Sequence, residues 1–435
     1  MLVRILTIKI MVMYWLIETE EQLEVLINSG YKKAFIEVIP YNDTIHPVLN
    51  HVSLVYIRPI EASKGFMVCV THSESLNVLN TCIDELLNIF EVLYCRDKKE
   101  VLHYFPNKAL YDINPPPHTY IRPSTQTHDL YYSKHKDNPH LNLIIPIVKH
   151  YELCETIFEN LKANINKEKD KYDEFFNNRV SVVFNAIERN GIRIHNDTFS
   201  EYFHEVDGEY VHTQFNLKTT TTRPSNKFKN VNYAALNKEN GCRKSFIPRN
   251  SRFVEIDISA YHPSLAAHLV NYTFPTSDIH SHFASLYNVD YKKSKELTFK
   301  QLYGGVFENY KKLEFFQRIE KYVGEIWSKF ERDGFVECKI SGFKYEKEKL
   351  QNMNPQKLFN YILQNLETSM NVLVLWDMVR ILRGKKTKLV LYTYDSFTLD
   401  IDDREEETLN DIRGIFKKYK LNIKEETGYD YNFRE

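Results

Sequence analysis

The sequence has little glycine and proline, and that scarcity excludes several classes of protein. Its 435 residues include 13 glycines and 15 prolines, too few for a collagen-like or low-complexity chain. None of the six cysteines belongs to a CxxC pair, so we expect no zinc ribbon, and their wide spacing is typical of reduced cytosolic thiols. The formal net charge of -1 at pH 7 argues against a polybasic protein but leaves room for a local basic groove.

Long apolar runs are also missing. The most apolar stretch, residues 1–17, carries Arg4 and Lys9 and is followed by glutamates, whereas a membrane span needs about 20 apolar residues with few charges. We therefore expect a strand there and no membrane partner. Hydrophobic residues make up 43% and charged residues 26%, which is the composition of an ordinary globular protein.

The chain is expected to form two main parts. Residues 1 to about 165 are predicted to be an α/β unit, because β-rich runs precede a helical pattern and so favour a mixed sheet. Those runs are 34–39, 52–57 and 66–70, and the helical pattern covers 75–90. A charged helix over about 154–178 then leads to a second part that mixes strands and long helices, with the boundary expected near 165–175.

A basic patch lies within residues 216–250, where Glu239 is the only acid. Such a patch is what a phosphate backbone requires, and nearby Thr, Ser and Asn side chains can bind phosphate or sugar. The alternative is a solvated loop with incidental charge, and the patch alone does not decide between the two. The basic residues are Lys218, Arg223, Lys227, Lys229, Lys238, Arg243, Lys244 and Arg249.

Two aspartates stand in strand contexts that disfavour them. Asp257 ends the β-prone run 253–257, and Asp395 lies between two β-prone runs without glycine or proline, which predicts a hairpin with the acid at its tip. If the two converged, their oxygens would suit Mg²⁺, and paired metals drive in-line phosphoryl displacement. Either acid alone is more simply explained as a strand end.

Helical spacing gives two further patterns. Lys295, Phe299 and Tyr303 recur every four residues before a glycine pair, so they share one helix face that could meet a triphosphate, a base and a sugar. The alternative is a core stripe with a snorkelling lysine. Asn360 and Gln364 have the same spacing and could reach minor-groove edges, although exposed amides usually face solvent.

Taken in order, these segments resemble the polymerase domain of family A DNA polymerases, the DNA polymerase I type, from about Ser181 to the C-terminus. The stretch 254–269 with Asp257 resembles motif A, the Lys295 helix matches motif B, and Tyr394-Asp395-Ser396 lies at motif C. The stretch from Thr219 through Arg243-Lys244 resembles the template–primer-binding segment. The chain looks most similar to the reduced polymerases of phage or viral type.

The resemblance implies an α/β, multidomain fold: a right-hand palm and fingers over 216–435, a linker and reduced thumb over 166–215, and a degenerate ribonuclease H-like exonuclease domain over 1–165. It also implies the roles of the site residues. Asp257 and Asp395 would hold two Mg²⁺ ions with the Ile258 carbonyl, and Lys295 would contact the nucleotide phosphates. Phe299 would pack on the incoming sugar and Tyr303 beside the templating base. The expected DNA contacts are Arg223, Asn232, Arg243, Lys244, Asn360 and Gln364.

The chain departs from the family pattern at three positions. Ser396 replaces the third carboxylate of motif C, which leaves two acids. His262 stands where the family has its sugar-excluding Glu, beside Tyr261, and we expect one of these two bulky groups to exclude a ribose 2′-hydroxyl. Tyr291 replaces an Arg four residues before Lys295, so Lys292 or Lys293 is expected to supply that phosphate contact.

The resemblance implies that the first 165 residues are an inactive exonuclease-like domain. The family's chemistry needs four acids, beginning with Asp-x-Glu on the first strand, but that strand here offers only Glu37. The remaining acids, Asp43, Asp97, Asp112 and Asp129, have no usable spacing, so we expect structural roles for them.

These patterns together predict a cytoplasmic, template-directed DNA polymerase of a bacterium or a virus-infected cell. Its partners would be primer–template DNA, dNTPs and a processivity or replisome protein. Three alternatives stay open: a single-subunit RNA polymerase, because Asp395-Ser396-Phe397 also resembles its motif C; an active proofreading enzyme; and a catalytically dead nucleic-acid-binding module.

Overall fold

The computed structural model describes residues 14–78, 80–116, 133–135, 138–203, 208–228 and 231–433. Residues 1–13 of the strand expected within 1–17 lie outside this part of the chain, as do Asp129 and Lys229, whereas Trp15–Ile17 forms a strand. The chain divides into two compact units, residues 1–169 with 176–185, and residues 170–175 with 186–435. No helix among the described residues is both long and apolar enough to cross a membrane.

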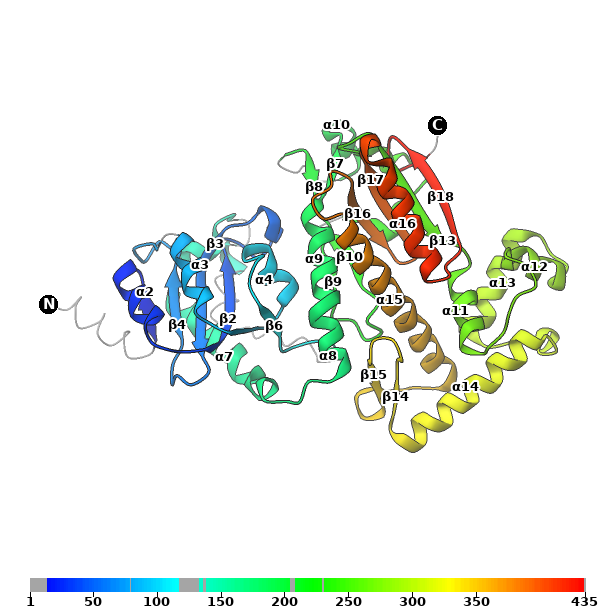
Figure 1. The fold of residues 1–435 in the computed structure, drawn as a ribbon, viewed down its shortest axis with the longest axis horizontal. Helices are drawn as coiled ribbons and strands as arrows, with labels where there is room; N and C mark the ends of the chain where they lie inside the picture. The colour runs from blue at the N-terminus through cyan, green and yellow to red at the C-terminus, as the bar shows by residue number, and fades with distance from the viewer. Residues whose placement is uncertain are drawn as a thin grey trace. The chain divides into compact units, whose positions relative to one another are not determined.

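The first unit is built on a mixed six-stranded sheet (Figure 1). Its two central strands, β2 and β3, are antiparallel, as are β3 and β4, whereas β5 and β6 continue the sheet parallel to β2. The order across the sheet is β1 (Trp15–Ile17), β4 (Phe66–Cys69), β3 (Val52–Pro59), β2 (Lys33–Pro40), β5 (Val92–Cys95) and β6 (Leu110–Asp112). The three β-rich runs expected from the sequence are thus strands of one sheet.

Helices cover both faces of this sheet, because strand residues of opposite parity are buried on each side. One hydrophobic core joins Ile36 and Val55 to the helices α2 (Glu20–Ile27), α3 (Asn80–Asn88) and α4 (Lys98–Tyr104). A second core joins Phe35 and Leu54 to α7 (Ile147–Leu161). The unit is therefore a three-layer sandwich of helices and sheet.

The helical predictions were right in type and wrong in their limits. The pattern over 75–90 corresponds to α3, which begins at Asn80 because the preceding residues form turns around the His72 backbone and the Asn77 side chain. The single helix expected over 154–178 is instead interrupted. The range holds the end of α7, a 3-10 turn (Lys162–Ile165), α8 (Lys171–Phe175) and the start of a five-residue π-helical turn. The next helix, α9 (Ser181–Asn190), begins beyond it.

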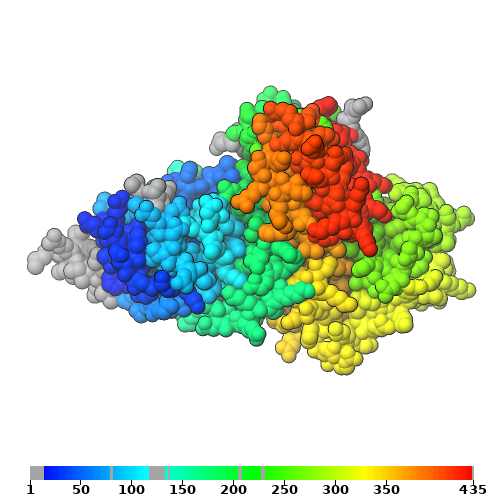
Figure 2. Space-filling model, in the orientation of Figure 1, coloured from blue at the N-terminus to red at the C-terminus, as the bar shows by residue number. Residues whose placement is uncertain are grey.

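The second unit contains an antiparallel sheet of four strands in the order β16 (Lys388–Thr393), β17 (Ser396–Ile401), β13 (Arg252–Ile258) and β18 (Ile423–Gly428). One face is apolar and packs against the helices α15 (Pro355–Ile381) and α16 (Glu406–Lys418), with Phe397 against Phe416. Because side chains alternate, Glu255 and Asp257 lie on the opposite face. Figure 2 shows the residues from 388 onward, orange to red, as one continuous part of this unit's surface.

Four helices extend from this sheet as an arm (Figure 1). They are α11 (Tyr261–Leu269), α12 (Ile279–Tyr287), α13 (Tyr291–Gly304) and the amphipathic α14 (Glu314–Asp333). Aromatic rings of Phe274, Phe283 and Phe315 pack within 6 Å of one another and join the arm into one body. Smaller elements, β7 (Ile192–Ile194), α10 (Asn196–Tyr202), β8 (Tyr210–Val211) and β12 (Phe246–Ile247), pack beside β13 around Phe253.

Candidate active site

The two aspartates singled out by the sequence lie at the same end of the four-stranded sheet. Asp257 occupies the penultimate position of β13, directly opposite Ser396 of β17. Asp395 belongs to the two-residue turn between β16 and β17, and its carbonyl accepts a hydrogen bond of 2.9 Å from the Ile258 amide. Strand pairing thus brings together two residues that are far apart in the sequence.

The turn that holds Asp395 is strained and braced. Its other residue, Tyr394, has φ 60°, a left-handed conformation that costs a residue other than glycine about 1 kcal/mol or more. The Asn371 amide donates a 2.7 Å hydrogen bond to the Tyr394 carbonyl, and the Arg223 guanidinium lies 3.7 Å from the centre of the Tyr394 ring. These contacts fix the turn in its strained form.

Both aspartates bind protons more tightly than exposed carboxyls do. Burial, followed by the charges of Asp395 and Glu255, raises the pKa of Asp257 to about 6, while Lys295 and Lys424 oppose the shift. Burial also raises the pKa of Asp395, and the charge of Glu367 acts in the same direction. Two carboxylates crowded in this way favour the arrival of a positive charge.

A third carboxylate, which the sequence reading did not identify, lies beside them. Glu255 precedes Asp257 by two positions on the same strand face and accepts a 2.6 Å hydrogen bond from the Ser396 hydroxyl. Ser396 is the residue that replaces the expected motif C acid. The signal available in the sequence was the alternation Glu255-x-Asp257, which places both acids on one side of a strand.

The donors near Asp257 fit a hard divalent cation. Mg²⁺ prefers carboxylate and carbonyl oxygens, and Asp257, Asp395 and the Ile258 carbonyl provide them. Across the described residues, no group of three or more His, Cys, Asp and Glu side chains is close enough to hold a metal by itself. Any ion here would therefore draw on backbone, substrate or water oxygens in addition to the two acids.

Lys295, Phe299 and Tyr303 lie on one face of α13, as their spacing predicted. The Phe299 and Tyr303 rings are stacked, with an interplanar angle of 7° and centroids 5.9 Å apart. Lys295 is exposed, and its charge lowers the pKa of Asp257, which places it near the acids. Lys292 is also exposed, whereas Lys293 is paired with Glu296 at 3.0 Å on the same helix.

His262 is the centre of a buried polar cluster. Its Nδ1 shares a hydrogen bond with the Tyr303 hydroxyl, and its Nε2 lies 3.3 Å from the carboxylate of Glu367 on α15. Tyr261, the other bulky candidate, is buried and donates its hydroxyl to Asn371 at 2.8 Å. The structure therefore places His262, and not Tyr261, against the α13 face.

Arg223 is engaged by the protein itself. Its Nε lies 2.9 Å from the Glu367 carboxylate, whose side chain is 2% exposed. The residue expected to meet DNA thus compensates a buried acid and stacks on Tyr394, a role that the sequence could not reveal because Glu367 lies on a distant helix.

The other expected DNA contacts differ in accessibility. Arg243 is buried, donates to the Leu236 carbonyl at 3.0 and 3.1 Å, and lies over the Tyr431 ring. Asn360 donates to the Tyr303 carbonyl at 2.9 Å and so caps α13. Three remain accessible to a ligand: Asn232 and Lys244, which are exposed, and Gln364, which is half-buried.

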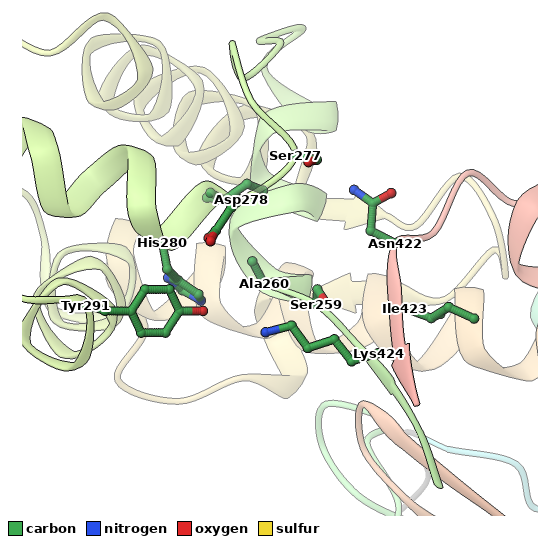
Figure 3. Close-up of a pocket in the computed structure, with 10 residues that line it drawn as sticks. Ser259, Ala260, Ser277, Asp278, His280, Tyr291, Asn422, Ile423 and Lys424 are labelled. Atoms are coloured by element: carbon green, nitrogen blue, oxygen red, sulfur yellow. The ribbon is translucent and has the colours of Figure 1, made fainter. Parts of the chain in front are cut away.

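A cavity of about 340 Å³ opens between the sheet and the arm, and Ser259, two residues after Asp257, is one of its lining residues. Its walls come from the β13–α11 junction, the start of α12, the first residue of α13 and the start of β18 (Figure 3). The lining residues that carry polar chemistry are Ser259, Ser277, Asp278, His280, Tyr291, Asn422 and Lys424.

Comparison with known proteins shows that the fold of this chain is similar to that of a solved structure. No family model matches the sequence, and no curated protein matches it. Among solved structures, the POL domain of Pol1 from M. smegmatis, in complex with DNA primer-template and dNTP, superposes with a TM-score of 0.65 at 9% sequence identity. The match covers 96% of this chain and 99% of that chain, so nearly the whole molecule has the fold of a polymerase domain.

Proposed function

We propose that this chain is a template-directed DNA polymerase, adding deoxynucleotides to a primer 3′ end. The observation that carries the proposal is the meeting of Asp257 and Asp395 at one end of a sheet, beside the Lys295 face of α13. The fold likeness to a polymerase domain that binds primer-template and dNTP supports it. Belonging to family A, in a reduced form of phage or viral type, is part of the proposal, as is a cytoplasmic location.

Two Mg²⁺ ions are the proposed cofactors, held by Asp257, Asp395 and the Ile258 carbonyl. When bound, they would supply a lowered pKa at the primer 3′-hydroxyl and charge neutralisation at the leaving pyrophosphate. Burial, followed by the charges of Asp395 and Glu255, raises the pKa of Asp257 to about 6. This supports a cation site, because a nearby positive charge favours the ionised carboxylate. Glu255, hydrogen-bonded through Ser396, adds negative charge to the same end of the sheet.

The α13 residues would bind and orient the nucleotide. Lys295, exposed near the acids, would contact the phosphates and would give a proton to the leaving group. The stacked Phe299 and Tyr303 rings would form an apolar wall for the sugar and the base. Lys292 and Lys293 are also exposed in the first turn of α13, but Lys293 is paired with Glu296. We therefore assign Lys292 a weaker, solvent-screened contribution.

His262 would select deoxyribose. It is 5% exposed and held between Tyr303 and Glu367, so it cannot move aside for an added hydroxyl without breaking a buried cluster. We expect His262→Ala to raise the use of ribonucleotides relative to deoxynucleotides by about tenfold or more. Single-nucleotide incorporation with dCTP and rCTP opposite the same template base would measure this ratio.

The accessible side chains would make the contacts with the primer–template. Asn232, Lys244 and Gln364 can reach phosphate or minor-groove acceptors, whereas Arg223, Arg243 and Asn360 would act from within by bracing Tyr394, Leu236 and the end of α13. We also propose that the thumb is reduced, so that a processivity or replisome protein would assist on long templates.

The first unit would be an exonuclease-like domain without activity. Its mixed sheet with helices on both faces is compatible with a ribonuclease H-like fold. Glu37 is paired with Arg96 at 2.5 Å, Asp97 caps α4 through the Glu100 amide at 3.1 Å, and the buried Asp112 accepts from the Asn114 amide at 2.7 Å. Acids committed to structural bonds in this way are poor metal ligands.

A primer-extension assay with dNTPs and rNTPs side by side, at varied Mg²⁺, tests the proposal. We expect extension of the primer by the template-complementary deoxynucleotide and little use of ribonucleotides. Preferential incorporation of ribonucleotides would favour the single-subunit RNA polymerase instead. Absence of any extension, with retained DNA binding, would leave the binding-module alternative.

A further inference from the structure

A single buried carboxylate, that of Glu367, lies between two residues to which the proposed function gives different tasks. The side chain of Glu367, on α15, is 2% exposed. Its Oε2 lies 2.9 Å from Arg223 Nε and 3.3 Å from His262 Nε2, and its Oε1 accepts a 3.4 Å hydrogen bond from Arg223 Nη2. A carboxylate removed from water is costly unless it is paired, so the two partners hold Glu367 in place and are held by it.

The carboxylate is shared between these partners and saturated by neither. The two contacts at Oε2 are close enough for ion pairs, but neither has the angle of a hydrogen bond. Within the described part of the chain, Glu367 is the only acid within 4 Å of Arg223 or His262. A change at one partner therefore alters the attraction that remains for the other.

On one side, Glu367 fixes the orientation of the imidazole ring. An ionised carboxylate can only accept hydrogen bonds, so His262 Nε2, which faces it, is expected to carry the ring proton. In the neutral ring, Nδ1 is then an acceptor and can receive the hydrogen bond of the Tyr303 hydroxyl. The ring is thus held between α13 and α15 in one tautomer, in the place from which His262 would exclude a ribose 2′-hydroxyl.

On the other side, Glu367 holds Arg223 against the turn that carries Asp395. The Arg223 guanidinium lies 3.7 Å from the centre of the ring of Tyr394, which precedes Asp395 and has φ 60°. The charges of the cluster also reach the acid itself. Burial raises the pKa of Asp395 and the charge of Glu367 acts in the same direction, while Arg223 and His262 oppose the shift.

We propose that Glu367 is a positioning residue that couples sugar selection to the catalytic turn. The inference rests on the proposed function and adds to it a buried residue that would touch neither nucleotide nor DNA. Through His262, Glu367 would keep the deoxyribose filter in place, and through Arg223 it would keep the Asp395 turn in its catalytic form. Loss of the Glu367 charge would therefore change the choice of sugar and the rate of catalysis together.

The test uses the full chain and single-nucleotide primer extension with Mg²⁺, dCTP and rCTP. Glu367→Gln keeps the size of the side chain and removes its charge. We expect it to raise the use of rCTP relative to dCTP about tenfold, as His262→Ala does, and to lower kcat for dCTP about tenfold. The double variant Glu367→Gln/His262→Ala should show no further gain in rCTP use, because both changes remove the same support.

Asp377→Asn is the matched control. Asp377 is also a carboxylate of α15 in an ion pair, with Lys418 of α16 at 2.6 Å, and its side chain is 17% exposed. Urea denaturation of both variants separates a loss of stability from a loss of position, because Asp377→Asn should cost stability without changing the choice of sugar. A rise in rCTP use as large in Asp377→Asn as in Glu367→Gln would reduce the effect to general destabilisation.

Three further results would overturn the assignment, while primer extension by the wild type leaves the polymerase proposal standing. A folded Glu367→Gln with the wild-type ratio of rCTP to dCTP use would show that His262 keeps its place alone. A raised ratio at the wild-type kcat would remove the coupling to the Asp395 turn. Effects of Glu367→Gln and His262→Ala that multiply in the double variant would show that the two residues act separately. If the folded wild type extends no primer, the proposed function itself fails, and this role with it.

Discussion

Asp257 shows at the scale of one residue how a functional site opposes stability. Its pKa of about 6 means that the native state holds this proton more tightly than the unfolded chain does. Asp257 therefore contributes fully to the stability of the native state below about pH 4, and this contribution is lost as the pH rises through about 6.

We expect Asp257→Asn to raise the free energy of unfolding by about 1 kcal/mol at pH 8 without divalent cations, a figure reduced for solvent screening of a half-buried group. The difference should shrink as the pH falls from 6 toward 4. Urea denaturation at several pH values measures it, with the exposed Asp411→Asn as control. A variant less stable than the wild type at pH 8 would mean that Asp257 has a stabilising partner in the free protein.

The residue scale also shows what the sequence could and could not predict. Asp257 and Asp395 were found because an acid in a hydrophobic strand context is locally anomalous. Glu367, Glu255 and Lys424 were missed because each is unremarkable among its neighbours, and their roles come from pairings with distant segments. Arg223 was expected to contact DNA, and its pairing with Glu367 could not be foreseen for the same reason, since Glu367 is 144 residues away.

At the scale of elements, α15 joins the sheet hairpin to the arm. The buried Asn371 of this helix donates to the Tyr392 hydroxyl at 2.9 Å and to the Tyr394 carbonyl at 2.7 Å. It also accepts from the Tyr261 hydroxyl at 2.8 Å. One amide therefore fixes α11, β16 and the turn of Asp395 relative to one another.

Replacing Asn371 with Ala should lower the free energy of unfolding by about 2–3 kcal/mol, because buried polar partners are left unsatisfied. Gln364→Ala, on the same helix but half-buried, should cost less than about 1 kcal/mol. Chemical denaturation compares the two. A loss below about 0.5 kcal/mol for Asn371→Ala would show that water replaces the amide and that the cluster does not brace the turn.

The types of the helices and strands could be predicted where local patterns were strong. The residues at which these elements begin and end could not. The hairpin around Asp395 and the helix of Lys295 follow from strand and helix periodicity. The interrupted run from α7 to α9 was missed because charged, helix-favouring residues continue through its breaks.

At the scale of the molecule, the likeness to a polymerase domain extends over both units, yet their chemistry differs. The second unit gathers crowded, incompletely paired acids at the end of a sheet. In the first, Glu37 is paired with Arg96, and Asp97 and Asp112 accept from backbone amides. We therefore expect catalytic activity in the second unit alone.

We accordingly expect no shortening of a primer with a mismatched 3′ end when Mg²⁺ is supplied without nucleotides. A gel time course measures this. Progressive 3′ resection that disappears in Glu37→Gln would revive the proofreading alternative and show that the pairing of Glu37 with Arg96 opens in solution.

The most direct measurement is single-nucleotide primer extension by the wild type and by Asp395→Asn, with circular dichroism to check that both are folded. The account predicts template-directed addition of one deoxynucleotide by the wild type and a rate at least about 100-fold lower in the variant, since losing a metal-binding carboxylate removes several kcal/mol of transition-state stabilisation. Equal rates in the two proteins, or no extension by the folded wild type, would contradict it.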